Sequence, residues 1–404
     1  MKQKLLFLIA DGMGDYPISE IKGKTPLEIA HTPNIDSITQ SSILGQCVTV
    51  PESLPPGSDI ANMALLGYNP LEYHTGRGPI EASAQQLDLD PSDLIYRLNL
   101  CTISELSAQG IMLDYCAGHI ATEEARKLID LLKSQLGNGV FEFITGLQYR
   151  HLLVQKNGQH GLEAKLNISP PHDLTNQSLA SDLETFAQSD SLKNLIYRAS
   201  ELLQDNYPHA KANAIWPWGQ GSSLALPNFQ ETFGYKGAVI SAVDLIKGLG
   251  RSAGLEVYDI PGATGLLDTN YQGKVEAAQE FLEQGQFLFL HVEGPDECGH
   301  AGNLVDKIEA IQRFDHLIVG PLLKTIKNHR AACLIACDHL TPIIKKTHTS
   351  EPVPFLFYNP RSPLNHSQSL FCERTAAETG LTVEKGYNLL PWVLSQLGEK
   401  HVQA

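Results

Sequence analysis

Short apolar runs bounded by turn residues recur along the chain, and they predict buried β-strands. Amphipathic stretches of helical length separate several of these runs, among them residues 242–254 and 307–326. Alternation of buried strands with helices is typical of an α/β fold built on a mostly parallel sheet flanked by helices. The predicted strands are residues 4–10, 237–241, 255–260, 286–294, 331–339 and 352–358.

The middle of the chain has a different pattern, and we interpret it as a smaller inserted α+β domain. Its predicted elements are two helices, 122–136 and 178–188, and two strands, 140–145 and 151–156. The predicted division is therefore a discontinuous core of residues 1–79 and 235–404 and an inserted domain of residues 80–234.

The return from the inserted domain to the core is expected to be a linker from Pro217 to Pro227. Two tryptophans, Trp216 and Trp218, stand at the start of this tract. Large aromatic side chains favour burial, so we expect this linker to pack rather than to flex.

Composition narrows the class of protein. The 404 residues are 42% hydrophobic, which excludes a disordered chain, and the net charge of −15 argues against a nucleic-acid-binding protein. Asp11 interrupts the N-terminal apolar run, which therefore predicts a buried strand rather than a signal peptide or membrane span. Seven cysteines without CxxC spacing fit a reducing cytoplasm. We expect a cytoplasmic protein with a small-molecule partner, no nucleic acid and no membrane.

Aspartate and histidine residues follow several predicted strands, where α/β sheets place their ligands. A pair such as Asp296 and His300 is weak evidence alone, because such pairs are common on solvated helix faces. Six such residues at strand ends favour a centre that holds two metal ions, which needs ligands from separate elements. They are Asp11, Asp296, His300, Asp338, His339 and His348.

Ser58 is the candidate nucleophile. Pro-Pro-Gly precedes it, and the spacing of Ile60, Met63 and Leu66 predicts a helix that starts there. A serine at this place commonly caps the helix. A hydroxyl at a helix N-terminus can also be activated beside a metal ion, and both roles remain open at this point.

An ordered set of motifs resembles one family across essentially the whole chain: the archaeal-type cofactor-independent phosphoglycerate mutases of the alkaline phosphatase superfamily. The motifs are LIADGMGD, HTPNID, PPGSDIANMALLGYNP, GRGPIEA, DYCAGHI, GAVISAVDLIKG, HVEGPDECGH, DHLTP and THTSEPVPF. The chain departs from the family pattern at Leu340 and Glu351, neither of which is a proposed ligand. The resemblance implies an alkaline-phosphatase-like core and an inserted domain that covers the substrate.

The resemblance also implies roles for individual residues. Ser58 is expected to be phosphorylated transiently and to share one metal ion with three other ligands. Two divalent ions are expected, Mn²⁺ first, with Mg²⁺, Zn²⁺ and Co²⁺ as alternatives, and no 2,3-bisphosphoglycerate. The implied ligand sets are Asp11, Ser58, Asp338 and His339 for one ion, and Asp296, His300 and His348 for the other.

Two divalent ions and these ligands would be close to neutral, so a phosphorylated substrate needs further cations. The motif context favours four substrate-binding residues: Arg77, His119, Arg150 and Lys274. His31 and His291 are expected to be structural. GLGRSAG at 248–254 is expected to end a helix rather than to bind a nucleotide.

Three activities compete at this stage, and a fourth interpretation, a metal-stabilised binding module that has lost activity, is disfavoured because Ser58 and every proposed ligand are present. The first is an isomerase that moves phosphate between the 2- and 3-hydroxyls of glycerate through phosphorylated Ser58. The second is a homoserine kinase-like phosphotransferase, proposed for a bacterial branch of the same family. The third is plain phosphate hydrolysis on the same core.

Overall fold

The first strand, β1 (Leu5–Ala10), is buried along its whole length and lies inside an eight-stranded sheet. The sheet order is β13-β2-β12-β11-β1-β10-β8-β9. β1 pairs in parallel with β11 (Ala332–Ala336) on one side and with β10 (Phe287–Val292) on the other. Because the carboxyl ends of parallel strands meet at one edge, the loops after these three strands lie next to one another.

The computed structural model describes residues 2–87, 89–365, 368 and 370–398. Contacts divide the chain into two units, a first unit of residues 1–74 and 225–404 and a second unit of residues 75–224. No helix in the part of the chain that the model describes combines the length and apolar character needed to cross a bilayer.

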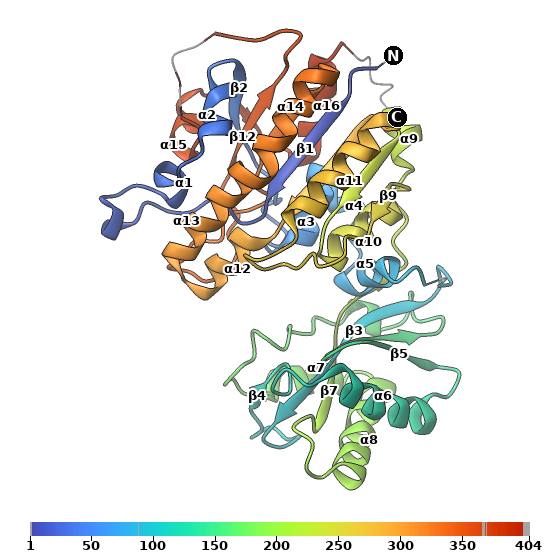
Figure 1. Cartoon of the computed structure of the whole chain (residues 1–404). Helices are drawn as coiled ribbons and strands as arrows, with labels where there is room; N and C mark the ends of the chain where they lie inside the picture. Colours follow the sequence, from blue (N-terminus) through green and yellow to red (C-terminus); the bar gives the residue numbers. More distant parts are fainter. Residues whose placement is uncertain (1, 88, 366–367, 369, 399–404) are drawn as a thin grey trace. The chain divides into compact units, whose positions relative to one another are not determined.

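The first unit contains the eight-stranded sheet and the helices around it, and in Figure 1 β1 is seen between α14 and α11. Its remaining strands are β2 (Ser42–Cys47), β8 (Gly237–Ile240), β9 (Glu256–Tyr258), β12 (Val353–Tyr358) and β13 (Thr382–Val383). Its helices are α1 (Pro26–Ile29), α2 (Pro33–Thr39), α3 (Ser58–Leu65), α4 (Pro70–Tyr73), α9 (Phe229–Phe233), α10 (Asp244–Ser252), α11 (Tyr271–Gln284), α12 (Gly294–Ala301), α13 (Leu304–Arg313), α14 (Gly320–His329), α15 (Glu373–Glu378) and α16 (Leu389–Gln396).

All six strands predicted for the core are present. Five of them, β11, β1, β10, β8 and β9, form a parallel run, and the sixth, β12, is antiparallel to β11. The helical stretch predicted over 307–326 is confirmed, because α13, a π-helical segment and α14 follow one another directly. A π-helix, Phe314–Val319, separates α13 from α14. Pro321 lies in the first turn of α14 and has no N–H to continue the α-helical ladder.

The second unit is built on a five-stranded antiparallel sheet in which the long strand β3 pairs with β4, β6 and β7. One face of this sheet packs on α6 and α8 around a core that includes Tyr96, Leu98 and Trp216. Its strands are β3 (Leu94–Ile103), β4 (Met112–Asp114), β5 (Phe141–Leu147), β6 (Arg150–Gln155) and β7 (Ala214–Ser222). Its helices are α5 (Arg77–Ala84), α6 (Thr122–Leu136), α7 (Ala180–Phe186) and α8 (Asp190–Asn206).

The tract that contains the two tryptophans is a strand that continues to Ser222, so the linker predicted from Pro217 started too early. β7 covers Ala214–Ser222 and pairs with β3, and both Trp216 and Trp218 are buried. Pro217 misled the prediction because proline usually interrupts a sheet. β7 pairs with β3 alone, and an edge strand tolerates a residue without an N–H.

Candidate metal centre

The loops that follow β1, β10 and β11 carry the acidic and imidazole side chains predicted from the sequence. Asp11 follows β1, and Asp338 with His339 follows β11. Asp296 and His300 lie one turn apart on α12, directly after β10, so their side chains share one face of that helix. All are partly or fully withdrawn from solvent.

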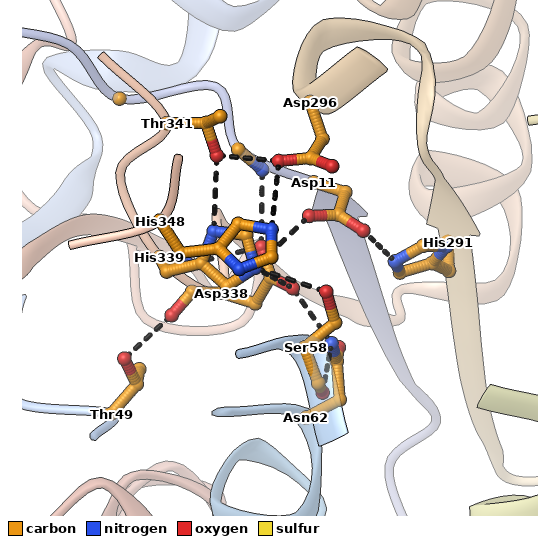
Figure 2. A network of polar contacts seen from close by, with 12 residues as sticks. Asp11, Thr49, Ser58, Asn62, His291, Asp296, Asp338, His339, Thr341 and His348 are labelled. Atoms are coloured by element: carbon orange, nitrogen blue, oxygen red, sulfur yellow. Dashed lines mark hydrogen bonds and ion pairs between the residues drawn. The ribbon is translucent and has the colours of Figure 1, made fainter. Parts of the chain in front are cut away.

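A first cluster forms where the ends of β1 and β11 meet. Asp11, Asp338 and His339 each offer a ligand atom, and these atoms lie within 4.8 Å of one another. His339 Nε2 lies 3.6 Å from Asp11 Oδ1 and 3.4 Å from Asp338 Oδ2. Ser58 Oγ lies 3.0 Å from the same His339 nitrogen, so the hydroxyl reaches this cluster (Figure 2).

A second cluster is formed by Asp296, His300 and His348, whose ligand atoms also lie within 4.8 Å of one another. The Nε2 atoms of His300 and His348 are 2.9 Å apart, and His300 Nε2 is 3.2 Å from Asp296 Oδ2. Burial alone would lower the pKa of His300, but the hydrogen bond and charge of Asp296 raise it to about 9. A proton and a metal ion would therefore compete for the Nε2 atom of His300.

The two clusters are adjacent, because Asp11 and Asp296 belong to a further group with Glu293 in which the oxygen atoms again lie within 4.8 Å. Burial, followed by repulsion from Asp338 and Asp296, raises the pKa of Asp11 well above its usual range. Crowded carboxylates of this kind are stabilised by cations.

The donor set fits divalent metal ions. Asp11 is 1% exposed, and its Oδ1 accepts no hydrogen bond from any residue that the structure describes. A buried carboxylate oxygen without a donor is costly unless a cation or another ligand meets it. Mixed carboxylate and imidazole ligands suit Mn²⁺, Zn²⁺ and related ions. The six predicted residues thus lie in two clusters that could each hold one ion.

Ser58 is the first residue of α3, and Gly57 takes the N-cap position. The interpretation of Ser58 as a helix cap is therefore wrong, since its backbone is already helical and its hydroxyl turns to His339. Asn62, one turn later, donates to Asp338 Oδ2 at 2.7 Å and to the carbonyl of Ser58 at 2.9 Å. This amide fixes the distance between the hydroxyl-bearing turn and the first cluster.

Residues around the clusters orient the ligands. His291 is buried, and its Nε2 lies 2.9 Å from Asp11 Oδ2, which agrees with the structural role predicted for it. Thr341 Oγ1 donates to Asp296 Oδ1 at 2.5 Å and lies 3.2 Å from His339 Nδ1, so it touches both clusters (Figure 2). Such outer contacts set ring orientation and carboxylate direction.

A glycine is required at position 12 because side chains of neighbouring segments lie very close to its Cα. Its φ is +59°, and a Cβ there would lie 2.6 Å from both Asp296 Oδ1 and Thr341 Oγ1. Its backbone N–H donates to Asp338 Oδ1 at 3.1 Å. The absence of a side chain at this position lets the β1 loop touch ligands from both neighbouring strands.

A basic cluster occupies one part of the second unit. The guanidinium of Arg97 lies 4.4 Å from the ring centre of Trp218, and that of Arg77 lies 5.9 Å from the same ring. Arg97 pairs with Glu81 at 3.0 Å. Burial, opposed by Glu81 and reinforced by Arg77 and Arg150, lowers the pKa of Arg97. One carboxylate against three guanidinium groups leaves this cluster able to attract an anion.

Ring contacts connect this cluster to the other predicted substrate-binding residues of the second unit. Trp218 contacts His172, which contacts Tyr115, which contacts Tyr149, with ring centres 5.4, 6.1 and 5.7 Å apart. Arg150 lies over the ring of Tyr149, and the ring centre of His119 is 6.3 Å from it. Arg77, His119 and Arg150 therefore belong to one neighbourhood.

Lys274, the fourth predicted substrate-binding residue, lies in the first unit. Its side chain is fully buried on α11, and Nζ donates to the carbonyl of His291 at 3.0 Å. Burial lowers the pKa of Lys274 to about 8, opposed by the charge of Glu293. This ammonium group stands behind Asp11 and the end of β10.

Three residues of these sites were missed by the sequence analysis: Asn62, Arg97 and Glu293. Arg97 had a usable signal, because it is a charged residue inside the otherwise apolar run LIYRLNL. Asn62 is polar within an apolar helical stretch and is spaced one turn from Ser58. Glu293 had no local signal beyond its place directly after β10.

Comparisons with known proteins agree with this geometry. A family model described as 2,3-bisphosphoglycerate-independent phosphoglycerate mutase matches residues 39–207. A probable enzyme of that name from Geobacter sulfurreducens is 41% identical over 97% of this chain and 100% of its own. One from Methanosarcina barkeri is 42% identical over 96% of this chain and 98% of its own.

A solved structure from Pyrococcus horikoshii covers 100% of both chains with a TM-score of 0.79 and 29% identity. The similarity in sequence and in fold therefore extends over nearly the whole chain, through the loops that carry the metal-type side chains and through the second unit. The chain belongs to the family of 2,3-bisphosphoglycerate-independent phosphoglycerate mutases.

Proposed function

We propose that this chain interconverts 2-phosphoglycerate and 3-phosphoglycerate without 2,3-bisphosphoglycerate, through a phosphorylated serine. The observation that carries the proposal is the 3.0 Å contact between Ser58 Oγ and His339 Nε2 at the start of α3. The hydroxyl stands at the edge of two adjacent clusters that suit divalent cations. This arrangement supports phosphoryl transfer to and from the serine.

The proposed ligands follow the two clusters. Asp11, Ser58, Asp338 and His339 are assigned to one ion, and Asp296, His300 and His348 to the other. We propose Mn²⁺ as the resident metal, with Mg²⁺, Zn²⁺ and Co²⁺ as competitors. When bound, such ions supply Lewis acidity toward phosphoryl oxygens and lower the pKa of a coordinated hydroxyl.

The chain's own groups perform the transfer. Ser58 Oγ gives up its proton and attacks phosphorus. The Oγ–P bond forms, the bond from phosphorus to the glycerate oxygen breaks, and that oxygen takes up a proton to become a hydroxyl. The glycerate reorients, and its other hydroxyl takes the phosphoryl group back from Ser58. The reacting hydroxyl lies at the N-terminus of α3, where the positive end of the helix dipole stabilises negative charge. Asn62 keeps Ser58 at a constant distance from Asp338.

Binding of the glycerate is assigned to basic residues. We propose that Arg77, Arg97, Arg150 and His119 bind the carboxylate and phosphate of the substrate, and that Lys274 supplies positive charge in the first unit. Guanidinium forks match both anions in shape. The second unit, predicted as residues 80–234, is proposed to cover the substrate and exclude the water that would hydrolyse phosphoserine.

The test is incubation of Mn²⁺-loaded enzyme with 3-phosphoglycerate in the absence of ATP and 2,3-bisphosphoglycerate. We expect 2-phosphoglycerate from the wild type and none from Ser58→Ala. Release of orthophosphate without 2-phosphoglycerate would indicate a hydrolase. Phosphorylation of homoserine only after ATP is added would establish the kinase alternative, which no contact described above favours.

The proposed setting is the cytoplasm. All seven cysteines lie among the described residues and are buried free thiols, which fits a reducing compartment.

A further inference from the structure

A buried ammonium group lies behind the candidate metal centre, on α13. Lys307 and its partner Asp15 both have side chains with 0% exposure, and Nζ is 2.8 Å from Asp15 Oδ2. Nζ also donates to the carbonyls of Gly14 at 3.0 Å and Thr341 at 2.7 Å. The three N–H groups of the ammonium therefore each meet one acceptor.

These acceptors come from the two loops that bear metal-type ligands. Gly14 and Asp15 belong to the loop that begins with Asp11, after β1, and Thr341 belongs to the loop that begins with Asp338, after β11. Asp15 Oδ2 also accepts from the backbone N–H of Ile343 at 3.1 Å. Lys307 and Asp15 thus join both loops to α13.

The joined segments touch the ligands directly. Thr341 donates through Oγ1 to Asp296 Oδ1, and it is the carbonyl of the same residue that Lys307 holds. On the other loop, two residues before Gly14, Gly12 N donates to Asp338 Oδ1. A Cβ at Gly299 would lie 2.5 Å from the Thr341 carbonyl oxygen, so α12 packs closely against the residue whose carbonyl Lys307 holds.

We propose that Lys307 is a positioning residue that sets the spacing between the Asp11 loop and the Asp338 loop and thereby the metal affinity of both clusters. The proposal rests on the proposed function, because it takes the clusters to be metal sites. Lys307 contacts none of the proposed ligands and acts through Gly14, Asp15 and Thr341.

The choice of a lysine agrees with this role. Burying an ion pair costs desolvation, and an apolar pair of similar volume commonly gives equal or greater stability. An apolar side chain cannot hydrogen-bond to two carbonyls and a carboxylate at once. The planar guanidinium of arginine directs its donors as a fork, whereas an ammonium directs three donors apart. Lys307 therefore gives the fold less stability than an apolar residue could, but it fixes the positions of the three acceptors that it contacts.

The test compares Mn²⁺ binding, measured by calorimetry on metal-free folded protein, in four proteins: wild type, Lys307→Met, the double variant Lys307→Met/Asp15→Asn, and Ile311→Val. Ile311 is buried on the same helix one turn later, so its variant controls for general destabilisation. The double variant removes both charges of the buried pair, so neither partner is left behind, and it is the folded comparison if Lys307→Met does not fold.

We expect Lys307→Met to raise the Kd for Mn²⁺ at least about tenfold, as loss of outer contacts of metal ligands commonly does. The kcat should fall while KM for 3-phosphoglycerate stays within about twofold. The double variant should recover thermal stability but keep the raised Kd. Ile311→Val should lose stability and bind Mn²⁺ like the wild type.

Two results would overturn the proposal, and they differ. Wild-type Mn²⁺ affinity in folded Lys307→Met or in the double variant would reduce Lys307 to a structural residue and leave the proposed function intact. Failure of the wild type to bind Mn²⁺ would overturn the proposed function and this proposal together.

Discussion

The functional side chains of the two units are held in opposite ways. In the first unit, Asp11, Asp338 and His339 are buried, and they have few degrees of freedom left because they start loops at the ends of paired strands. In the second unit, Arg77 and Arg150 reach their neighbours by long side chains that lie over aromatic rings. The difference indicates that the first site is preorganised, whereas the second can adapt to an anion.

The charges of the two sites are opposite as well. Carboxylates crowd the first site, where burial and then repulsion from Asp338 and Asp296 raise the pKa of Asp11, while three guanidinium groups approach one another in the second. The first charge distribution favours cations, and the second favours an anion, which is the basis of the roles proposed for them. Each prediction below tests one side of this contrast.

The largest effect is expected from Asp11→Asn in the first unit. Loss of one carboxylate from the point where both clusters meet should lower the mutase kcat more than about a thousandfold, or about 4 kcal/mol. Added Mn²⁺ should restore little of this activity. Asp259→Asn is the matched control, since that aspartate is 67% exposed and pairs with Lys247. Comparable loss in both variants would contradict a site-specific role.

The next effect concerns the pH dependence of the second unit's stability. His151 is buried in β6, where its Nδ1 accepts from Gly146 N at 3.0 Å, and burial lowers its pKa to about 4. Below pH ~6.5 His151 becomes protonated in the unfolded chain, whereas in the folded chain it stays neutral until the pH approaches 4. Stability should therefore fall as the pH drops from about 6.5 to 4, by up to about 3 kcal/mol, and the loss should level off below that range.

Urea unfolding of the whole chain at several pH values, followed through the tryptophans of the second unit, measures this dependence. His151→Gln should flatten the curve between pH 6.5 and 4, and the exposed His209→Gln should leave it unchanged. A curve that keeps its slope in His151→Gln would show that another group is responsible.

A smaller effect is expected from the basic cluster. Arg97→Gln should raise the KM for 3-phosphoglycerate about 10- to 100-fold, because a charge-assisted contact to an anion contributes about 1.5–3 kcal/mol. Arg198→Gln is the control on the same unit, as Arg198 is 64% exposed and pairs with Glu201. Steady-state kinetics would contradict the assignment if both variants shifted KM equally.

The smallest effect tests the backbone of the first site. Lys346 has φ +56°, a left-handed conformation, and its carbonyl lies 3.0 Å from His300 Nδ1. Lys346→Gly should change the free energy of unfolding by less than about 0.5 kcal/mol, while the β-branched Lys346→Val should destabilise by about 1–2 kcal/mol. Urea unfolding measures both. Equal effects would mean that the backbone conformation is not under strain.

Much of the first unit could be predicted from the sequence. The apolar runs located six of the eight strands of the core sheet and missed β2 and β13, and polar residues after several of these strands supplied the candidates for both clusters. The prediction succeeded because parallel strands bring their carboxyl ends to one edge, so order along the chain is enough to bring Asp11 and Asp338 together. The predicted start of a helix at Ser58 is confirmed, and only the alternative role of Ser58 as the N-cap is wrong, since Gly57 takes that position.

Less of the second unit could be predicted. The strand β7 was hidden by Pro217, and Arg97 meets Trp218 only because β3 and β7 pair in antiparallel register. Pairing between segments more than a hundred residues apart leaves no periodicity in either segment. The three groups that Lys307 meets are likewise invisible locally, because two of them are backbone carbonyls.

The sequence by itself therefore determined the fold class, the family and the residue types of the candidate metal centre, since these depend on local hydrophobic patterning and on motifs. Tertiary structure alone decided which side chains meet. It placed Asn62 between Ser58 and Asp338, gathered three arginines near one another in the second unit, and fastened two ligand loops to a buried lysine. Those contacts depend on register and close packing, which a linear pattern does not encode.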